Sequence, residues 1–494
     1  MNTVQVYLNK KHAVVPYLRN NTTGSRAVRN SANFLIRNTY TALGKSEAER
    51  TPNENAVLLK VCMCLEEANR RKTEYHEKQL ASGREHTLKL HRFPDEDHKT
   101  LSYEQIDAVL KLSEDMAYYS CTSQVNQQAI RKTCGSWKAF FAALKRYKED
   151  PSSFTGRPRI PGYIRTEEAT AHFPAQVAVF AVNDADGKGY LRFANSETSL
   201  CLGSIPCSGT YVKTEVVPCS DGYKLMITFD DGSVFPEAPE SPERIMAIDP
   251  GVSNFAACVT NTGSRPFIID GRYIKSINRS YNRNLARYRS ILCKGHDSDD
   301  GVVRTSKRIL RLSEKRDDRL RDLFYKASHA ICRKAESQGV EVIVFGHNKG
   351  QKQDPGMGRI NNQNFVQIPY LKFYSALRNT ASKYGIAVIM QEESYSSRAD
   401  FKAMDPVPTY GTDEVEPVFS GSRVKRGLYR HADGTVSNAD INGAANILRK
   451  RYDHAFNGVD TGFVNSVDMV RVKDLYPQFR LQKARYKKIK KVSP

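Results

Sequence analysis

Apolar and polar positions alternate differently along the chain and divide its first half into a helical and a strand-rich part. Between residues 25 and 150 apolar residues recur every third or fourth position, most clearly from Gln127 to Tyr147. Short strand-like runs separated by Gly, Asp and Ser follow between residues 172 and 229. With an alternating run near the N-terminus (Val4, Val6 and Leu8), they predict a small β-barrel into which the helical part is inserted.

The second half follows a Pro-rich segment, Phe235–Pro242, which predicts a linker. The predicted order behind it is three strands, basic helices over 273–338, a strand at Val340–Phe345, a helix at Tyr370–Tyr384, a strand at Ile386–Met390 and a helix from about Asp440 to Tyr452. This order predicts an α/β fold of ribonuclease H type (RuvC-like), an open mixed sheet flanked by helices.

Acidic residues stand at the ends of these predicted elements. Asp249 closes the first strand before a Pro-Gly turn, Glu392 and Glu393 follow the last strand, and Asp440 begins the last helix. Each has an ordinary explanation alone: a turn, a surface strand end, or a residue favoured by the helix dipole. On this layout, however, Asp249, Glu393 and Asp440 converge. Such a set suits two Mg²⁺ ions, or Mn²⁺, held about 4 Å apart to cleave a phosphodiester.

The charge balance adds a polyanionic partner to this picture. The 494 residues contain 75 Lys and Arg against 54 Asp and Glu, a formal charge of +21, which favours nucleic acid. No run of about 18 apolar residues and no signal peptide is evident, so a cytoplasmic or nucleoid-associated protein without membrane contact is expected. The ten cysteines include no Cys-x-x-Cys pair and none after Cys332, so no zinc is expected.

Basic residues in loops and helices are candidates for contacts with nucleic acid. On the helix from Gln127 to Tyr147 the Lys and Arg positions fit either a nucleic-acid channel or a solvated face. The specific candidates are Arg157, Arg159, Arg308, Arg311, Lys315, Lys349, Lys352, Arg423, Lys425 and Arg426.

Six stretches between residues 245 and 452 carry a resemblance to a known family. They are Ile248-Asp-Pro-Gly-Val-Ser-Asn, Phe345-Gly-His-Asn-Lys-Gly, Gln363-Asn-Phe-Val-Gln-Ile-Pro, Glu393-Ser-Tyr-Ser-Ser, Ser420-Gly-Ser-Arg-Val-Lys-Arg-Gly-Leu-Tyr-Arg and Asn438-Ala-Asp-Ile-Asn-Gly-Ala-Ala-Asn-Ile. In order and spacing they resemble TnpB-type transposon-associated nucleases, or compact type V CRISPR effectors descended from them. Residues 137–161 also resemble the region ahead of that family's barrel, whereas residues 20–120 match only in general character.

The resemblance implies an RNA-guided DNA endonuclease that cuts both strands of a duplex target beside a short motif, with a guide RNA as partner. A monomer is favoured. The implied domains are a first strand of the barrel (wedge) at 1–20, a helical recognition domain at 21–150, the wedge barrel at 151–242, the nuclease core at 243–393, a target-strand loading loop at 394–438, a last nuclease helix at 439–456 and a basic tail at 457–494.

The chain departs from the family pattern at two places. The family's middle carboxylate ends the strand before the central loop, but here that strand reads Val344-Phe-Gly-His-Asn with no acid. The role would pass to Glu393 or Glu392. Only one of two neighbours on a strand can face the metals, and the resemblance favours Glu393, three residues before Ser396. The family's four-cysteine zinc ribbon is also missing between 398 and 438, where Arg423, Lys425, Arg426 and Arg430 stand instead.

Two other functions fit the same residues. One is a nuclease-inactive, RNA-guided DNA-binding protein that silences or recruits; the three acids count against it. The other is a structure-selective resolvase-type nuclease with the same fold, which would need neither guide RNA nor so large an N-terminal half.

Overall fold

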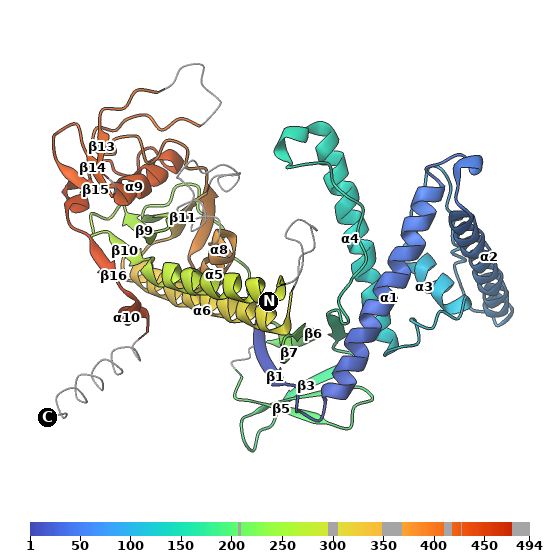
Figure 1. Ribbon diagram of the computed structural model, residues 1–494. Helices are drawn as coiled ribbons and strands as arrows, with labels where there is room; N and C mark the ends of the chain where they lie inside the picture. Colours follow the sequence, from blue (N-terminus) through green and yellow to red (C-terminus); the bar gives the residue numbers. More distant parts are fainter. Residues whose placement is uncertain (206–208, 295–304, 348–367, 410–416, 426, 477–494) are drawn as a thin grey trace. The chain divides into compact units, whose positions relative to one another are not determined.

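The computed structural model describes residues 1–205, 209–294, 305–347, 368–409, 417–425 and 427–476 (Figure 1). The chain forms two compact units, Met1–Gly232 and Ser233–Pro494, and the boundary falls just before the Pro-rich segment predicted as a linker. No helix among the described residues is long and apolar enough to cross a membrane.

Four helices of the first unit share one apolar core: α1 (Val15–Ala42), α2 (Pro52–Ala81), α3 (Tyr103–Leu112) and α4 (Ser123–Glu149). The buried Trp137 of α4 is fixed in this core because its indole N–H donates to Oδ1 of Asn33 on α1 at 2.8 Å. Helix α1 begins within the segment 1–20 that was predicted as a barrel strand, because strand β1 (Asn2–Asn9) ends before that segment does.

The strands of the first unit form two sheets around a second core. One has the order β1-β7-β6-β2, with β7 (Gly222–Asp230), β6 (Thr210–Cys219) and β2 (Ala171–Pro174); the other is β3 (Ala178–Val182), β4 (Gly189–Phe193) and β5 (Ser199–Gly203). In the described residues no hydrogen-bonded ladder joins the sheets, so the predicted barrel is not a closed ring. The strand-like segment that begins at residue 172 is divided after Pro174, whose nitrogen carries no hydrogen for a ladder, into β2 and β3.

The second unit is built on a six-stranded sheet of order β12-β11-β8-β9-β10-β16. Its first five members in the chain are β8 (Ile245–Asp249), β9 (Asn254–Thr260), β10 (Phe267–Asp270), β11 (Val342–Gly346) and β12 (Ala387–Gln391). Strand β9 runs antiparallel to β8 and β10, whereas β11 is parallel to β8 and β12. This order and direction confirm the predicted ribonuclease H-like core.

The sixth strand, β16 (Asp468–Val470), lies in the segment 457–494 that was predicted to be a basic tail. It pairs in parallel with the edge strand β10, and the short helix α10 (Val472–Leu475) follows it. Leu475 and Tyr476 are buried in the core of the unit. The correction has a simple reason: three residues are too few to show the period of a strand in the sequence.

Alternating side chains of the sheet face two separate helical layers. On β8, Met246 and Ile248 pack with α5 (Arg272–Leu292), α6 (Lys307–Ser337) and α8 (Tyr370–Ala381), and α5 lies beside α6 (Figure 1). Ile245 and Ala247 point to the opposite face and pack with α9 (Ala439–Arg451). Since side chains on a strand alternate, Asp249 belongs to the face covered by α9.

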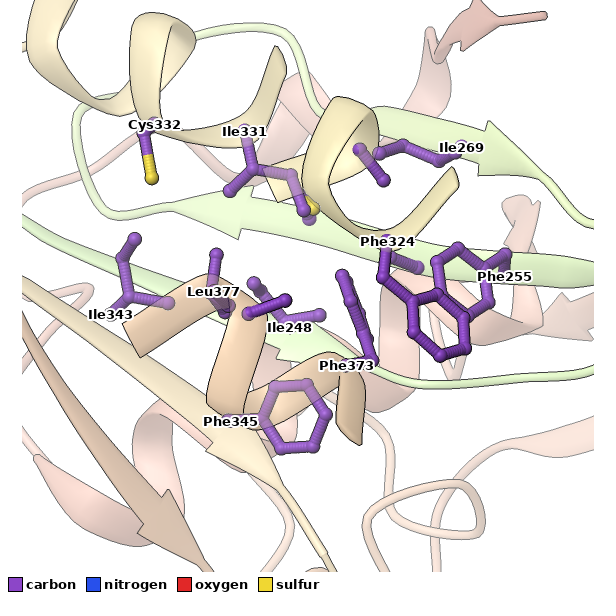
Figure 2. Packing of buried hydrophobic residues seen from close by; sticks show 14 of the residues in the cluster. Ile248, Phe255, Ile269, Phe324, Ile331, Cys332, Ile343, Phe345, Phe373 and Leu377 are labelled. Carbon is purple, nitrogen blue, oxygen red and sulfur yellow. The ribbon is translucent and has the colours of Figure 1, made fainter. Parts of the chain in front are cut away.

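An aromatic cluster fills the first of these layers beneath the ends of β8 and β11 (Figure 2). The rings of Phe255 and Phe324 are stacked at 5.5 Å, and Phe373 of α8 lies 4.4 Å from Phe255 and 5.7 Å from Phe345. All four side chains are almost fully buried. Their packing fixes the strand ends, on whose other face the acids stand.

The segment between β12 and α9 contains a small sheet, β13 (Ser422–Lys425), β14 (Leu428–Arg430) and β15 (Val436–Asn438), held by a buried polar network. His431 places Nδ1 2.6 Å from Oδ1 of Asp400 and Nε2 2.7 Å from Oγ of Ser437. Asp400 also accepts from the backbone N–H groups of Lys402, Ala403 and Ala432. Asp–His–Ser is the order of a hydrolase triad, but all three side chains are buried, so the network is structural.

We predict that Asp400→Ala lowers the free energy of unfolding of the second unit by about 3–5 kcal/mol, because it leaves the buried His431 and three backbone donors without an acceptor. Urea unfolding followed by circular dichroism measures the change. Asp433→Ala is the matched control, because Asp433 is an exposed acid paired with Lys402 in the same segment. Equal stability of Asp400→Ala and the parent would contradict a structural role for the network.

Candidate active site on the α9 face of the sheet

Asp249, the last residue of β8, lies directly against helix α9. A Cβ atom at Gly443 of α9 would stand 2.7 Å from Oδ2 of Asp249, closer than side chains normally approach. Glycine inside a helix costs about 1 kcal/mol relative to alanine, and this close approach explains its presence. The strand tip, the Pro-Gly turn and the glycine thus bring one carboxylate to the helix surface.

Glu393 occupies the space beside the end of β11. A Cβ atom at Gly346 would overlap Oε2 of Glu393 and would stand 2.6 Å from Cδ1 of Ile447 on α9. Gly346 pairs with Gln391 of β12, and Glu393 lies two residues beyond it with 8% of its surface exposed. A carboxylate from just beyond the neighbouring strand therefore stands where a side chain at the end of β11 would point.

Asp440 is placed by the start of helix α9. The side chain of Asn438 caps the helix by accepting from the N–H groups of Asp440 and Ile441 at 2.9 and 3.4 Å. Nδ2 of Asn254, the first residue of β9, donates to Oδ2 of Asp440 at 2.7 Å. Nη2 of Arg423 on β13 lies 3.9 Å from Oδ1 of the same carboxylate.

The charges of Glu393 and Asp440 act on Asp249. The pKa of Asp249 is raised well above its usual value, first by burial and then by the negative charges of Glu393 and Asp440, while Arg423 partly offsets the shift. The negative charges also act on the buried Tyr370, at the start of α8. Burial and the charges of Asp249 and Glu393 raise the pKa of its phenol. The cluster is therefore a site where a cation is favoured.

Glu392 is held away from this cluster by Lys450 of α9. Nζ of Lys450 lies 2.5 Å from Oε2 of Glu392, and the N–H of Ser394 donates to Oε1 of Glu392 at 2.6 Å. Burial acts to raise the pKa of Glu392, but the hydrogen bonds from Lys450 and Ser394 outweigh it and lower that pKa. The neighbouring glutamates thus have different surroundings.

The donor set fits hard divalent cations by its chemistry, since it consists of carboxylate oxygens. Gly346 and Gly443 leave the space that side chains would fill. As the side chains stand, no group of three or more acidic, histidine or cysteine residues in the described part of the chain could hold a metal ion. Asp440 is directed to Asn254 and Arg423, so joint binding of a cation by all three acids requires a side-chain movement.

The predicted basic residues fall into four sets. Arg423 lies beside Asp440, and Lys425 is exposed on the same strand; Arg308, Arg311 and Lys315 are exposed on α6. Arg157 and Arg159 are exposed in the first unit. Lys349, Lys352 and Arg426 lie outside the described residues.

Four residues of the site were not predicted individually. Gly346 and Gly443 lie within stretches that carry the family resemblance. The absence of a side chain at these two positions could have been read from the sequence. Asn254 and Tyr370 reach the acids only through the folded chain, and nothing local in the sequence distinguishes them.

The fold and the acids together define a chain with a ribonuclease H-like core and an acidic site at its strand ends. A family model described as a probable transposase (OrfB_IS605) matches residues 219–352, which include β8 to β11. The match confirms the resemblance to TnpB-type proteins over this segment. No curated protein matches the chain.

Solved structures of guide-RNA effectors are similar to the chain only at low identity. A Cas12f1–sgRNA–target DNA complex is 14% identical over 90% of this chain and 98% of the other, with a TM-score of 0.42. The RNA-guided endonuclease CRISPR-Cas_phi3 is 11% identical over 73% and 86%, with a TM-score of 0.37. C2c1 of Alicyclobacillus acidoterrestris with single-guide RNA is 9% identical over 88% and 70%, with a TM-score of 0.32. Because these TM-scores are low, the fold assignment rests on the strand order above.

We predict that Asp249→Asn stabilises the protein at neutral pH without divalent cations. A carboxyl group whose pKa is raised by folding stabilises the folded state at pH values below the pKa of the unfolded state, which is near 3.9. This stabilisation is lost as the pH rises through the pKa of the folded state. Asn removes the buried charge. The melting temperature at pH 7 should rise by at least about 2 °C, the effect of about 1 kcal/mol in a domain of this size, and the gain should shrink toward pH 4.

Asp453→Asn provides the control, because Asp453 is 96% exposed and should give no such gain. A lower melting temperature for Asp249→Asn at pH 7 would show that Asp249 is not destabilised by its surroundings.

Proposed function

We propose that this chain is an RNA-guided DNA endonuclease that cuts both strands of a duplex target through a single two-metal site. The observation that carries the proposal is the convergence of Asp249, Glu393 and Asp440 on the α9 face. Burial and the charges of Glu393 and Asp440 raise the pKa of Asp249. Three acids gathered at a destabilising cost are typical of a site retained for chemistry. They also favour this proposal over a nuclease-inactive DNA-binding protein.

Asp249, Glu393 and Asp440 would hold Mg²⁺ ions, or Mn²⁺, which supply Lewis-acid stabilisation of the attacking and leaving oxygens of a phosphodiester. The surrounding residues position these acids. Asn438 and Asn254 orient Asp440, and Gly443 admits Asp249 to the helix surface. Lys450 withdraws Glu392, so Glu393 is the glutamate left to serve the site.

Guide RNA and duplex DNA are the partners that suit the rest of the chain. The net charge of +21 favours polyanions, and the similar Cas12f1 structure is a complex with sgRNA and target DNA. In this proposal the RNA pairs with the target, and the protein recognises backbone shape and a short adjacent duplex motif. Sequencing of the RNA that co-purifies tests the assignment, because a resolvase-type nuclease would carry none.

We predict that Asp249→Ala, Glu393→Gln and Asp440→Ala each reduce guided cleavage at least about 10³-fold, while guide and target binding change little, because metal chemistry acts on the transition state. Cleavage of a supercoiled plasmid and gel-shift titrations measure the two properties.

Glu392→Gln is the matched control and should retain most of the activity, because Glu392 pairs with Lys450 outside the cluster. If Glu392→Gln were inactive and Glu393→Gln active, the glutamate that binds the metal would be Glu392 and our assignment of Glu393 would be wrong. Full activity in both variants would require another acid to complete the site.

We further predict that helix α6 contributes backbone contacts. Replacing Arg308, Arg311 and Lys315 together by Ala should reduce the slope of log affinity against log salt for duplex DNA by up to about 2.7, since each phosphate contact contributes about 0.9. The control replaces Arg321 and Lys326 of the same helix, which already pair with Asp318 and Asp322. Equal slopes for both variants would exclude α6 from the interface.

A further inference from the structure

Two aromatic rings and an arginine form a compact cluster beside the acids. The ring centroids of Tyr395 and Phe419 lie 5.9 Å apart, and Cζ of Arg398 lies 5.8 Å from the first and 5.5 Å from the second. Tyr395 and Arg398 belong to the turn after β12, whereas Phe419 belongs to the segment leading into β13. We call these three residues the aromatic platform.

The platform is attached to the acidic site from both sides. Tyr395 follows Glu393 by two residues, and Cα of Ser397 lies 4.0 Å from the position of a Cβ at Gly443, which in turn approaches Asp249. Phe419 precedes Arg423, the residue beside Asp440, by four positions. Short stretches of chain therefore connect the platform to the residues of the acidic site.

The turn that carries Tyr395 and Arg398 is held by hydrogen bonds from helix α9. Asn446 of α9 donates to the carbonyl oxygens of Ser396 and Ala399 at 2.9 and 2.7 Å, and Asn442 donates to Ala399 at 2.8 Å. Tyr395 has a φ of 61°, a left-handed conformation that is uncommon for a tyrosine. A strained backbone maintained by its surroundings is often found at functional sites.

The rings do not serve a core. Among the described residues that form the two hydrophobic cores of the second unit, neither Tyr395 nor Phe419 is included. Arg398 and Ser397 are exposed, and Val418 beside Phe419 is 90% exposed. Nearby charge is basic, with Arg423 and Lys425 exposed on β13. The platform thus lies at a partly exposed edge of the second unit, with the two rings half-buried and Arg398 exposed.

We infer that the aromatic platform binds an unpaired nucleobase of single-stranded DNA next to the phosphodiester at the acids. Bases of a single strand stack on aromatic side chains and on arginine, whereas bases in a duplex are already stacked on their neighbours. Basic residues on β13 would accompany the phosphates. The inference rests on the proposed nuclease function for the position of the strand, but stacking itself needs no cleavage.

The test measures binding of a short single-stranded oligodeoxynucleotide carrying 2-aminopurine to the full chain in an Asp249→Ala background. Stacking on the platform should quench the fluorescence of the probe. Replacing Tyr395 and Phe419 together by Leu keeps apolar volume but removes both π faces, and should abolish the quenching and weaken binding about 5- to 150-fold. The exchange Tyr395→Phe with Phe419→Tyr should preserve both properties.

Tyr325→Ala is the matched control, because it removes an exposed ring from α6 at a distance in the chain and should change neither property. Circular dichroism checks folding, and the single Leu variants replace the double variant if it unfolds. Unchanged binding and quenching in the Leu variants overturn the inference, even when guided cleavage is intact. Loss of guided cleavage in the parent, with quenching still dependent on the two rings, overturns only the proposed function.

Discussion

The close approach of helix α9 to one face of the sheet is the constraint on which the site depends. The approach is possible because Gly346 and Gly443 carry no side chains where Glu393 and Asp249 need the space. On the opposite face the Phe255–Phe324–Phe373 cluster fixes the strands (Figure 2). Tight packing on one face thus offsets the cost of gathering like charges on the other.

Local patterns in the sequence were sufficient to predict most of the core and the places of two acids in the fold. Asp249 ends an apolar strand and Asp440 begins a capped helix, so their places follow from neighbouring residues. Alternation along a strand was the reason to choose Glu393 over Glu392, but both residues lie beyond the end of β12, and in the fold Glu392 pairs with Lys450. In contrast, the filling of the space at Gly346 depends on the register of β11 against β12, and the contact of Asn254 with Asp440 joins residues 186 positions apart.

The segment before α9 shows a different limit of sequence reasoning. The sequence predicted a loading loop without a zinc ribbon at 394–438. The structure places there a buried Asp400–His431–Ser437 network and a second acid, Asp405, which accepts from the N–H groups of Asp400 and Ser420. Isolated polar residues in a loop carry no periodic pattern. Their partners become apparent only when the chain is folded, because buried polar groups must find hydrogen bonds.

This network also links the segment to the acids by charge. It supports the sheet of β13, β14 and β15, on which Arg423 stands, and β15 leads directly into the Asn438 cap and Asp440. Arg423 lowers the pKa of Asp249 against the effects of burial and the other acids. It thus acts as a partial counter-charge in the free protein. A phosphate that draws Arg423 toward itself would remove this counter-charge, so a strand on β13 would increase the preference of the acids for a cation.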